Sequence, residues 1–313
     1  MTGNRLRLSH SRAGFMRMVM MSQDKLFVIV EGRELDTPFY SGICESSHRV
    51  SRAGYQVWLI EQIEDANGKP TGGKKGLLSL FEYCKSQGKL RYSTPLGEKS
   101  FAFCLDRDNE NVTGGLKRSG HLIYTRLNDV ESEIFSQPLN ERVIMASLSI
   151  DRDSARRFLW ALGDWRLDLS NAWKEWIELC CLAKAIGART DVGFSKESII
   201  NGDRYGKMDA AAAASARARV LSRSNFDATR TMAIEKRVSD KIGKIYATGD
   251  PRTLLHGKWL SKFLAYRAKD YFAGKPVAFQ YFEGAVTRVH LYSLDYSAPW
   301  VDYYREKLHR LLS

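Results

Sequence analysis

Two apolar runs that end abruptly in acid constrain this chain more than any other feature. Residues 26–30 are Leu-Phe-Val-Ile-Val, followed by Glu31, and residues 101–105 are Phe-Ala-Phe-Cys-Leu, followed by Asp106 and then Asp108. Uninterrupted apolar runs are typical of strands inside a parallel sheet that is covered on both faces. Ligands of open α/β sheets bind outside the carboxyl ends of such strands. We therefore expect Glu31, Asp106 and Asp108 to converge on one crevice.

A third acidic group follows the short strand-like stretch at residues 122–125, and it consists of Asp129, Glu131 and Glu133. Several facing carboxylates are costly unless a cation neutralises them, and an oxygen-rich pocket suits Mg²⁺. Alternate side chains on a strand share a face, so an Asp-x-Asp strand end could direct both carboxylates to one ion. The pattern predicts a Mg²⁺-dependent enzyme that acts on phosphodiesters, with Mn²⁺ as the alternative ion.

The order of predicted elements indicates an α/β fold. Strands at residues 26–31, 55–63 and 122–125, together with the strand before Asp106, alternate with helices such as the one expected at residues 77–87. This alternation implies right-handed crossovers and a mostly parallel, Rossmann-like sheet. The pattern changes to helices from about residue 151, with strong helix formers in the alanine-rich stretch 208–223. A tail rich in tyrosine and tryptophan is expected to pack back onto the core.

We accordingly predict three segments. Residues 23–150 form the catalytic α/β domain, and residues 151–313 form a mainly helical, basic domain. The first 20 residues hold four arginines and no acid. Residues 1–22 are therefore interpreted as a basic N-terminal extension, which either a disordered arm or an overlong start would explain.

Charge is unevenly distributed, within a net charge of +12 for the whole chain. Residues 21–150 carry 16 basic and 17 acidic residues, whereas residues 151–313 carry 28 basic and 19 acidic residues. Residues 211–280 alone carry 14 basic and 5 acidic residues. A basic half can attract a polyanion by releasing its counterions, although a solvated helical surface has the same composition.

Cysteine content and hydropathy indicate the cellular compartment that the chain is expected to occupy. The five cysteines are odd in number, include no Cys-x-x-Cys pair and mostly lie in apolar stretches. This pattern predicts reduced thiols in a cytoplasm and no zinc site. No apolar run approaches the roughly 20 residues that a membrane-spanning helix needs, so no membrane association is expected.

The motifs resemble a known superfamily. Glu-Gly after the first strand, and Asp-x-Asp after a later one, resemble the TOPRIM superfamily, which includes topoisomerases, bacterial primases and overcoming-lysogenisation-defect nucleases. The order and spacing are similar over residues 26–135. Closer still is the resemblance to TOPRIM-like effectors of PARIS-type anti-phage defence systems. Three further motifs carry it: Gly72-Gly73-Lys74, Asn128-Asp129-Val130-Glu131 and Leu255-His256-Gly257-Lys258.

The resemblance implies a catalytic role for four of the acids. Glu31 would act as a metal ligand or general acid/base, and Asp106 and Asp108 would hold Mg²⁺. Glu131 would complete the site, with Asp129 capping the helix that presents it. Two ions roughly 4 Å apart would then activate water and stabilise the leaving oxygen.

The resemblance also implies roles for basic residues. Lys74 would neutralise a phosphate oxygen, and His256 and Lys258 would contact substrate phosphate or support the site from the helical half. Each acid also has a structural interpretation, in which Glu31 and Asp106 cap strand ends and pair with arginines. For two further acids we expect a structural role only: Asp36 caps a helix, and Glu133 lies on a solvated helix face.

By this resemblance the chain would be a TOPRIM nuclease and the toxic effector of a defence system in the bacterial cytoplasm. It would cleave host nucleic acid, with tRNA as the expected target. A partner ATPase would hold and release it, and it would act as a homodimer. One alternative is a non-catalytic nucleic-acid-binding or regulatory protein with a structural ion. Another is a P-loop NTPase using residues 68–75, although Lys75 occupies the position where a P-loop has Ser or Thr.

Four tryptophans in the helical half have two interpretations. Trp160, Trp165, Trp173 and Trp176 could stack on nucleic-acid bases. Their helical spacing favours core packing instead.

Overall fold

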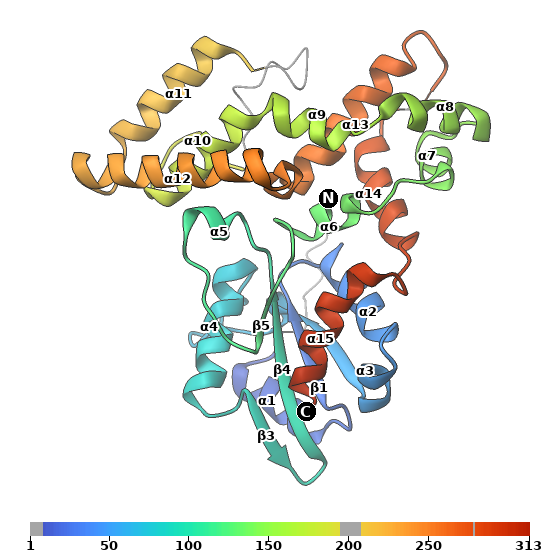
Figure 1. Cartoon of the computed structure of the whole chain (residues 1–313). Helices are drawn as coiled ribbons and strands as arrows, with labels where there is room; N and C mark the ends of the chain where they lie inside the picture. The colour runs from blue at the N-terminus through green and yellow to red at the C-terminus, as the bar shows by residue number, and fades with distance from the viewer. Residues whose placement is uncertain (1–8, 195–207, 278) are drawn as a thin grey trace, which may run out of the picture. The chain divides into compact units, whose positions relative to one another are not determined.

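The computed structural model describes residues 9–194, 208–277 and 279–313, and it divides the chain into two compact units (Figure 1). The sheet unit takes in the described residues up to Asp106, together with Lys117–Arg126 and Leu294–Ser313. The helical unit consists of Arg107–Leu116 and Leu127–Ser293. The expected α/β class with a mostly parallel sheet and additional C-terminal helices is confirmed.

The sheet has five strands in the order β2-β1-β4, with β3 and β5 both paired to β4. Their bounds are β1 Leu26–Val30, β2 Tyr55–Leu59, β3 Arg91–Thr94, β4 Gly97–Leu105 and β5 Leu122–Tyr124. β1 runs parallel to β2 and to β4, β5 runs parallel to β4, and only β3 is antiparallel. The register of β1 with β4 pairs Leu26 with Ser100 and Ile29 with Phe103.

Helices cover both faces of the sheet (Figure 1). The helical segments of this unit are α1 Arg12–Met21, α2 Asp36–Glu45, α3 His48–Ala53, the 3₁₀-helix η1 Ile60–Gln62, α4 Gly73–Ser86, the 3₁₀-helix η3 Pro299–Val301 and α15 Asp302–Leu311. On one face, Phe27 and Phe103 share a core with α1 and α4. On the other face, the Tyr40 side chain of α2 lies against Cys104 and the Tyr304 ring of α15. Burial on both faces explains why β1 is apolar throughout rather than alternating.

The first described helix corrects the predicted N-terminal extension. Ser11 caps α1 by accepting a hydrogen bond from the Gly14 N–H at 3.1 Å, and Phe15, Met16 and Val19 are buried in the core. Because these apolar residues lie on one side of a helix, they pack onto the sheet instead of extending into solvent. Residues 1–8 of the predicted extension lie outside the described residues.

The division between the units also differs from the predicted boundaries at residues 150 and 151. Leu294–Ser313 belongs to the sheet unit, because α15 buries Tyr304 and Leu308 there. Residues 127–150 belong to the helical unit, where Phe135 and Val143 enter the helical core. The expectation that the tail packs back onto the core is met by α15.

The helical unit is built from α5 Glu110–Thr113, α6 Val130–Ser136, α7 Glu141–Leu148, α8 Arg152–Leu162, α9 Trp165–Ala172, α10 Lys174–Ala185, α11 Ala210–Ser222, α12 Ala228–Thr248, the 3₁₀-helix η2 Pro251–Leu254, α13 Gly257–Tyr271 and α14 Phe282–Tyr292. Trp165, Trp173 and Trp176 are buried in its core, as their spacing predicted. The prediction is wrong for Trp160, which is 88% exposed.

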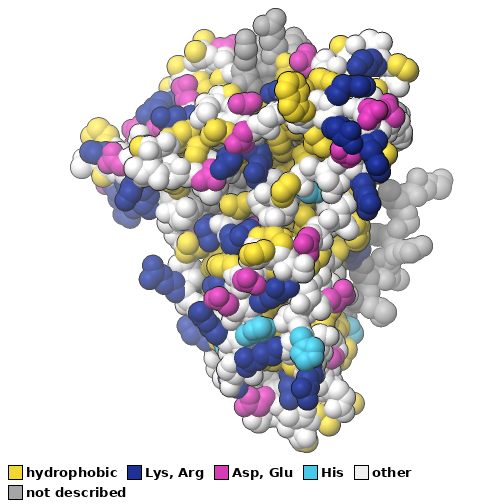
Figure 2. Space-filling model, turned by 45° about the vertical axis from the view of Figure 1, so that its right-hand side comes forward, with side chains coloured by type: hydrophobic (Ala, Val, Ile, Leu, Met, Phe, Trp, Pro, Cys, Tyr) yellow, Lys and Arg dark blue, Asp and Glu magenta, His cyan; other side chains and the backbone are white. Residues whose placement is uncertain are grey.

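The described surface is strongly charged. Figure 2 shows Lys and Arg side chains over the whole face drawn, and they gather at its upper right with some Asp and Glu side chains among them. No helix of the described ranges is long and apolar enough to cross a membrane.

Candidate active site

The topology of the sheet unit has a switch point at the carboxyl ends of β1 and β4. The chain leaves β1 through α2 and α3 to reach β2 on one side, and then passes through α4 and β3 to reach β4 on the other side. The connection that leaves β1 and the connection that reaches β4 therefore run to opposite sides of the sheet, so the strand order reverses between β1 and β4. Open α/β sheets bind ligands at such a switch point. Glu31 directly follows β1 there, and Asp106 directly follows β4.

Glu31, Asp106 and Lys74 come together at this switch point. The backbone N–H of Asp106 donates a hydrogen bond to Glu31 Oε1 at 3.2 Å. Lys74, in the first turn of α4, donates from Nζ to the backbone carbonyl of Asp106 at 2.6 Å, and its ammonium lies 5.6 Å from the centre of the Tyr124 ring. Glu31 thus binds the backbone N–H of Asp106, and Lys74 binds its backbone carbonyl. All three side chains are half-buried.

The turn after Glu31 is fixed by Asp36. The Gly32 N–H donates to Asp36 Oδ2 at 2.7 Å, and Asp36 is the first residue of α2. The predicted role as helix cap is therefore corrected: the N-cap position is Leu35, and the Asp36 carboxylate closes the turn instead. An added Cβ at Gly32 would lie 3.1 Å from Asp36 Oδ1, so the close approach favours glycine.

The geometry predicted for Asp-x-Asp is not observed. β4 ends at Leu105, and the backbone turns left-handed at Asp108 and Asn109, with φ values of 51° and 57°. The alternation of side chains along a strand therefore does not extend to Asp108. Its backbone N–H donates to the Asn128 carbonyl at 2.9 Å, and its own carbonyl accepts from Lys184 Nζ at 2.9 Å. Asp108 thus belongs to the helical unit by its contacts.

Asp129 caps two helices at once in the helical unit. As N-cap of α6 its Oδ1 accepts from the Ser132 N–H at 2.7 Å, which was predicted. The same carboxylate also accepts from the N–H of Gly257, the first residue of α13, at 3.1 and 3.0 Å. A carboxylate at a helix N-terminus is stabilised by the orphan N–H groups and the helix dipole. The motifs at residues 128–131 and 255–258 therefore meet.

His256 completes this buried cluster. Its Nδ1 lies 3.0 Å from Asp129 Oδ2. Burial alone would raise the pKa of Asp129, but the His256 charge and the hydrogen bonds from Ser132 and Gly257 outweigh it and lower the pKa to about 2. Burial also disfavours protonated His256, yet the charges of Asp129, Glu131 and Asp108 raise the pKa of His256 above its ordinary value. Each of the two side chains therefore favours the charged form of the other.

Glycine is required at position 257. An added Cβ there would overlap the Cβ of Glu131 and would lie 2.6 Å from Asp129 Oδ1. The α13 start therefore lies directly against the helix that carries Glu131. Lys258, the next residue, is exposed.

The interpretation of Glu133 as a solvated residue is wrong. Glu133 is completely buried, and its Oε1 accepts from the Leu127 N–H at 2.8 Å. The carboxylate thus pairs with the backbone just before α6, which explains how a buried acid is tolerated.

Asn109 and Lys184 were not singled out from the sequence, and Asn128 was named only as part of the motif at residues 128–131. Asn128 Oδ1 accepts from the Asn109 N–H at 2.7 Å, and the Nδ2 groups of both asparagines donate to the Leu254 carbonyl at 2.8 and 3.1 Å. Lys184 lies 3.8 Å from Asp108 Oδ2 and 3.9 Å from Glu110 Oε1. Only Asn128 carried a sequence signal, namely its place in that motif.

The donor chemistry suits a hard cation. Among the described residues, no group of three or more His, Cys, Asp or Glu side chains is arranged to hold a metal ion. Mg²⁺ keeps several waters and is commonly bound through one or two carboxylates plus substrate phosphate. Glu31 and Asp106 provide carboxylates of this kind in the sheet unit. Of the other predicted site residues, Asp108, Glu131, His256 and Lys258 belong to the helical unit.

No family model, curated protein or solved structure matches this chain. The membership in the TOPRIM superfamily that the motifs indicate therefore stays a prediction.

Proposed function

We propose that this chain is a metal-dependent nuclease whose catalytic centre lies at the carboxyl ends of β1 and β4. The observation that carries the proposal is the convergence of Glu31, Asp106 and Lys74 at the switch point of a mostly parallel sheet. Carboxylates beside a lysine suit a phosphodiester, because the acids can hold a divalent cation while the ammonium neutralises a phosphate oxygen.

Each residue has a defined task in this proposal. Glu31 and Asp106 would hold Mg²⁺ or Mn²⁺, with Asp108 and Glu131 as proposed further ligands. When bound, the ion would supply charge neutralisation and a water of lowered pKa. Lys74 would orient the scissile phosphate. The hydrogen bonds from Asp106 N–H to Glu31, and from Lys74 to the Asp106 carbonyl, keep these groups in fixed mutual positions, which lowers the entropy lost on reaching the reactive geometry.

The excess of basic residues in residues 151–313 supports a nucleic-acid substrate. The resemblance to the PARIS-type effectors extends the proposal to a toxic nuclease of anti-phage defence. On that basis its target would be host nucleic acid such as tRNA, a partner ATPase would restrain it, and the active form would be a homodimer.

A cleavage assay tests the nuclease. The purified chain is incubated with Mg²⁺ and total tRNA, single-stranded RNA or plasmid DNA, beside Asp106→Ala and Glu131→Ala and beside a reaction with chelator. Cleavage of one substrate class that is lost with chelator and in Asp106→Ala is expected. Loss in Glu131→Ala as well would assign that residue to the site. Equal cleavage by wild type and Asp106→Ala would refute the assignment.

Expression in bacteria tests the effector role separately. Expression of the chain alone should arrest growth, and Glu31→Ala should relieve the arrest. Equal arrest by both chains would show that toxicity does not come from this site, and would favour the alternative of a non-catalytic nucleic-acid-binding protein.

A further inference from the structure

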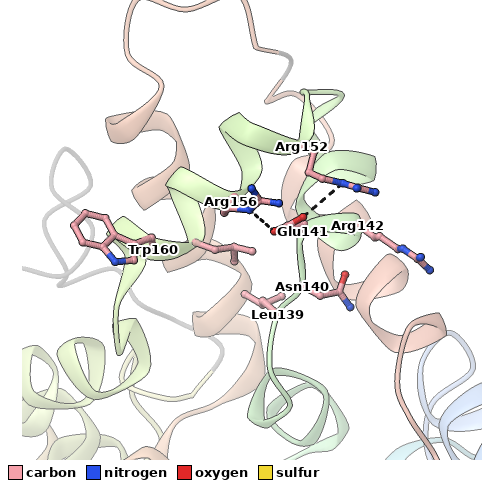
Figure 3. A pocket seen from close by; sticks show the side chains of 8 residues that line it. Leu139, Asn140, Glu141, Arg142, Arg152, Arg156 and Trp160 are labelled. Atoms are coloured by element: carbon pink, nitrogen blue, oxygen red, sulfur yellow. Dashed lines mark hydrogen bonds and ion pairs between the residues drawn. The ribbon is translucent and has the colours of Figure 1, made fainter.

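A pocket of about 850 Å³ opens in the helical unit beside the starts of α7 and α8 (Figure 3). α7 contributes Glu141 and Arg142, and α8 contributes Arg152, Arg156 and Trp160. The pocket shares no residue with the candidate active site. Its lining combines three arginines with one glutamate and an exposed indole.

Trp160 is the most exposed large hydrophobic side chain in the described part of the molecule, at 88%. It lies four residues after Arg156 and eight after Arg152 on the same helix. Residues spaced by four lie on one face of a helix, about 6 Å apart along its axis. Arg152, Arg156 and Trp160 therefore follow one another along α8, as Figure 3 shows. Exposed tryptophan beside arginine is characteristic of binding surfaces.

Glu141 orients both arginines of α8. Its Oε1 lies 2.8 Å from Arg156 Nε and its Oε2 lies 3.6 Å from Arg152 Nε, the contacts drawn as dashed lines in Figure 3. Glu141 thus approaches each guanidinium through Nε. No described residue pairs with the terminal nitrogens of Arg152, and Arg142 has no ion pair with a described acid. These donors are available to an anion, and the pocket keeps a positive excess.

We propose that this pocket binds a single-stranded segment of nucleic acid, with an unpaired base stacked on Trp160 and backbone phosphates paired with Arg152 and Arg142. Binding of single strands typically combines aromatic stacking platforms with a basic track. Protein interfaces also use tryptophan and arginine, so a protein partner is the alternative that the test must exclude. Nucleic acid is favoured because the terminal nitrogens of Arg152 and the guanidinium of Arg142 have no acidic partner among the described residues and suit phosphate groups. The proposal deepens the proposed nuclease function by naming a substrate contact outside the catalytic centre, but the binding itself requires no cleavage.

The test measures binding without turnover. Fluorescence anisotropy of short labelled single-stranded RNA and DNA is recorded with the full chain in the presence of chelator, so that metal-dependent cleavage does not contribute. Trp160→Ala should weaken binding about tenfold, the usual size of one lost base stack. The matched control is Tyr292→Ala, which removes another aromatic residue of the helical unit that is 76% exposed and lies outside the pocket. It should bind as the wild type does.

Salt dependence separates stacking from charge. Each phosphate contact contributes about 0.7 to the slope of log affinity against log salt for single strands. Arg152→Ala should lower the slope by about that amount, whereas Trp160→Ala should weaken binding with the slope unchanged. Arg237→Ala, an exposed arginine of α12 outside the pocket, is the charge control.

Two outcomes would overturn the proposal. Unchanged affinity in Trp160→Ala would exclude stacking there and would leave this face to a protein partner. Equal loss in Arg152→Ala and Arg237→Ala would indicate unspecific attraction by the basic surface. Neither outcome bears on catalysis, because failure of the proposed nuclease would appear as equal cleavage by wild type and Asp106→Ala.

Discussion

The backbone N–H of Asp106 donates a hydrogen bond to Glu31 Oε1 at 3.2 Å, across the carboxyl ends of two neighbouring parallel strands. The contact gives Glu31 a structural task in addition to its proposed catalytic one. Because the side-chain oxygen of glutamine can accept the same hydrogen bond, a substitution can remove the charge and keep this contact.

Glu31→Gln should therefore separate stability from catalysis. We expect its thermal midpoint to stay close to that of the wild type, while Mg²⁺-dependent cleavage falls by about a hundredfold or more, because a neutral amide is a poor ligand for a hard cation. Glu306→Gln, an exposed glutamate of α15 in the same unit, is the control. A variant that is destabilised but equally active per folded molecule would assign Glu31 to structure alone.

Lys74 and Lys75 form a natural matched pair. Lys74 Nζ donates to the Asp106 carbonyl at 2.6 Å and lies over the Tyr124 ring, whereas Lys75 is exposed. Lys74→Ala should lower the free energy of unfolding by about 1–2 kcal/mol and slow cleavage, since a charged hydrogen bond and a cation–π contact are lost. Lys75→Ala should change stability by less than about 0.5 kcal/mol. Urea unfolding of both variants measures this, and equal effects would contradict the assignment.

Gly257→Ala should destabilise the helical unit by about 1–3 kcal/mol, because the added methyl group overlaps Glu131 and crowds the Asp129 carboxylate. Gly243→Ala is the control within the same unit: it lies inside α12, and nothing stands within 4 Å of an added Cβ. That change should stabilise by about 0.5–1 kcal/mol through the lower backbone entropy of the unfolded chain. Thermal denaturation compares them, and a neutral Gly257→Ala would mean that α13 and α6 separate easily.

His290 predicts a pH dependence of stability. It is 2% exposed, its Nε2 lies 3.2 Å from the Gln137 carbonyl, and burial lowers the pKa of His290 to about 4. The unfolded chain takes up the proton first, near pH 6.5. The folded state is therefore not penalised by His290 above about pH 6.5, where this side chain is neutral in both states. As the pH falls toward about 4, protonation of His290 in the unfolded chain lowers the free energy of unfolding by up to about 3 kcal/mol.

His290→Gln keeps a donor for the Gln137 carbonyl but does not titrate. Denaturant midpoints at about pH 7 and about pH 5 should differ less in this variant than in the wild type. An identical pH dependence in both chains would show that other groups account for the acid loss.

Local sequence patterns predicted every strand of the sheet except β3. The apolar runs identified β1 and β4 because strands covered on both faces show their burial directly. β3 was not predicted, because an edge strand such as Arg91–Thr94 is polar and only partly buried. α1 was not predicted, because the arginines of the first 20 residues suggested a basic extension. The apolar face formed by Phe15, Met16 and Val19 indicates a packed helix instead.

Glu31 and Asp106 lie 75 positions apart, and their proximity was predictable because each directly follows an apolar strand. The contacts of Asp129 in the helical unit were predictable only in part. The Asp129 cap lies three residues from Ser132 and was expected, whereas its second bond, to Gly257, joins residues 128 positions apart.

Within α8 the buried residues Ala155, Phe158 and Leu162 are spaced by three and four, as on one face of a helix. Trp160 lies two residues from Phe158 and from Leu162, out of phase with that face, and it is exposed. The prediction failed because the four tryptophans were treated as one group although they lie on different helices.

The rate of nucleic-acid cleavage as a function of Mg²⁺ concentration, compared between the wild type and Asp106→Asn at equal amounts of folded protein, tests the central claim most directly. We predict a rate that saturates with Mg²⁺ in the wild type and falls by about a hundredfold or more in Asp106→Asn, since a proposed metal-binding carboxylate is lost. Equal rates and equal Mg²⁺ dependence in the two chains would contradict it.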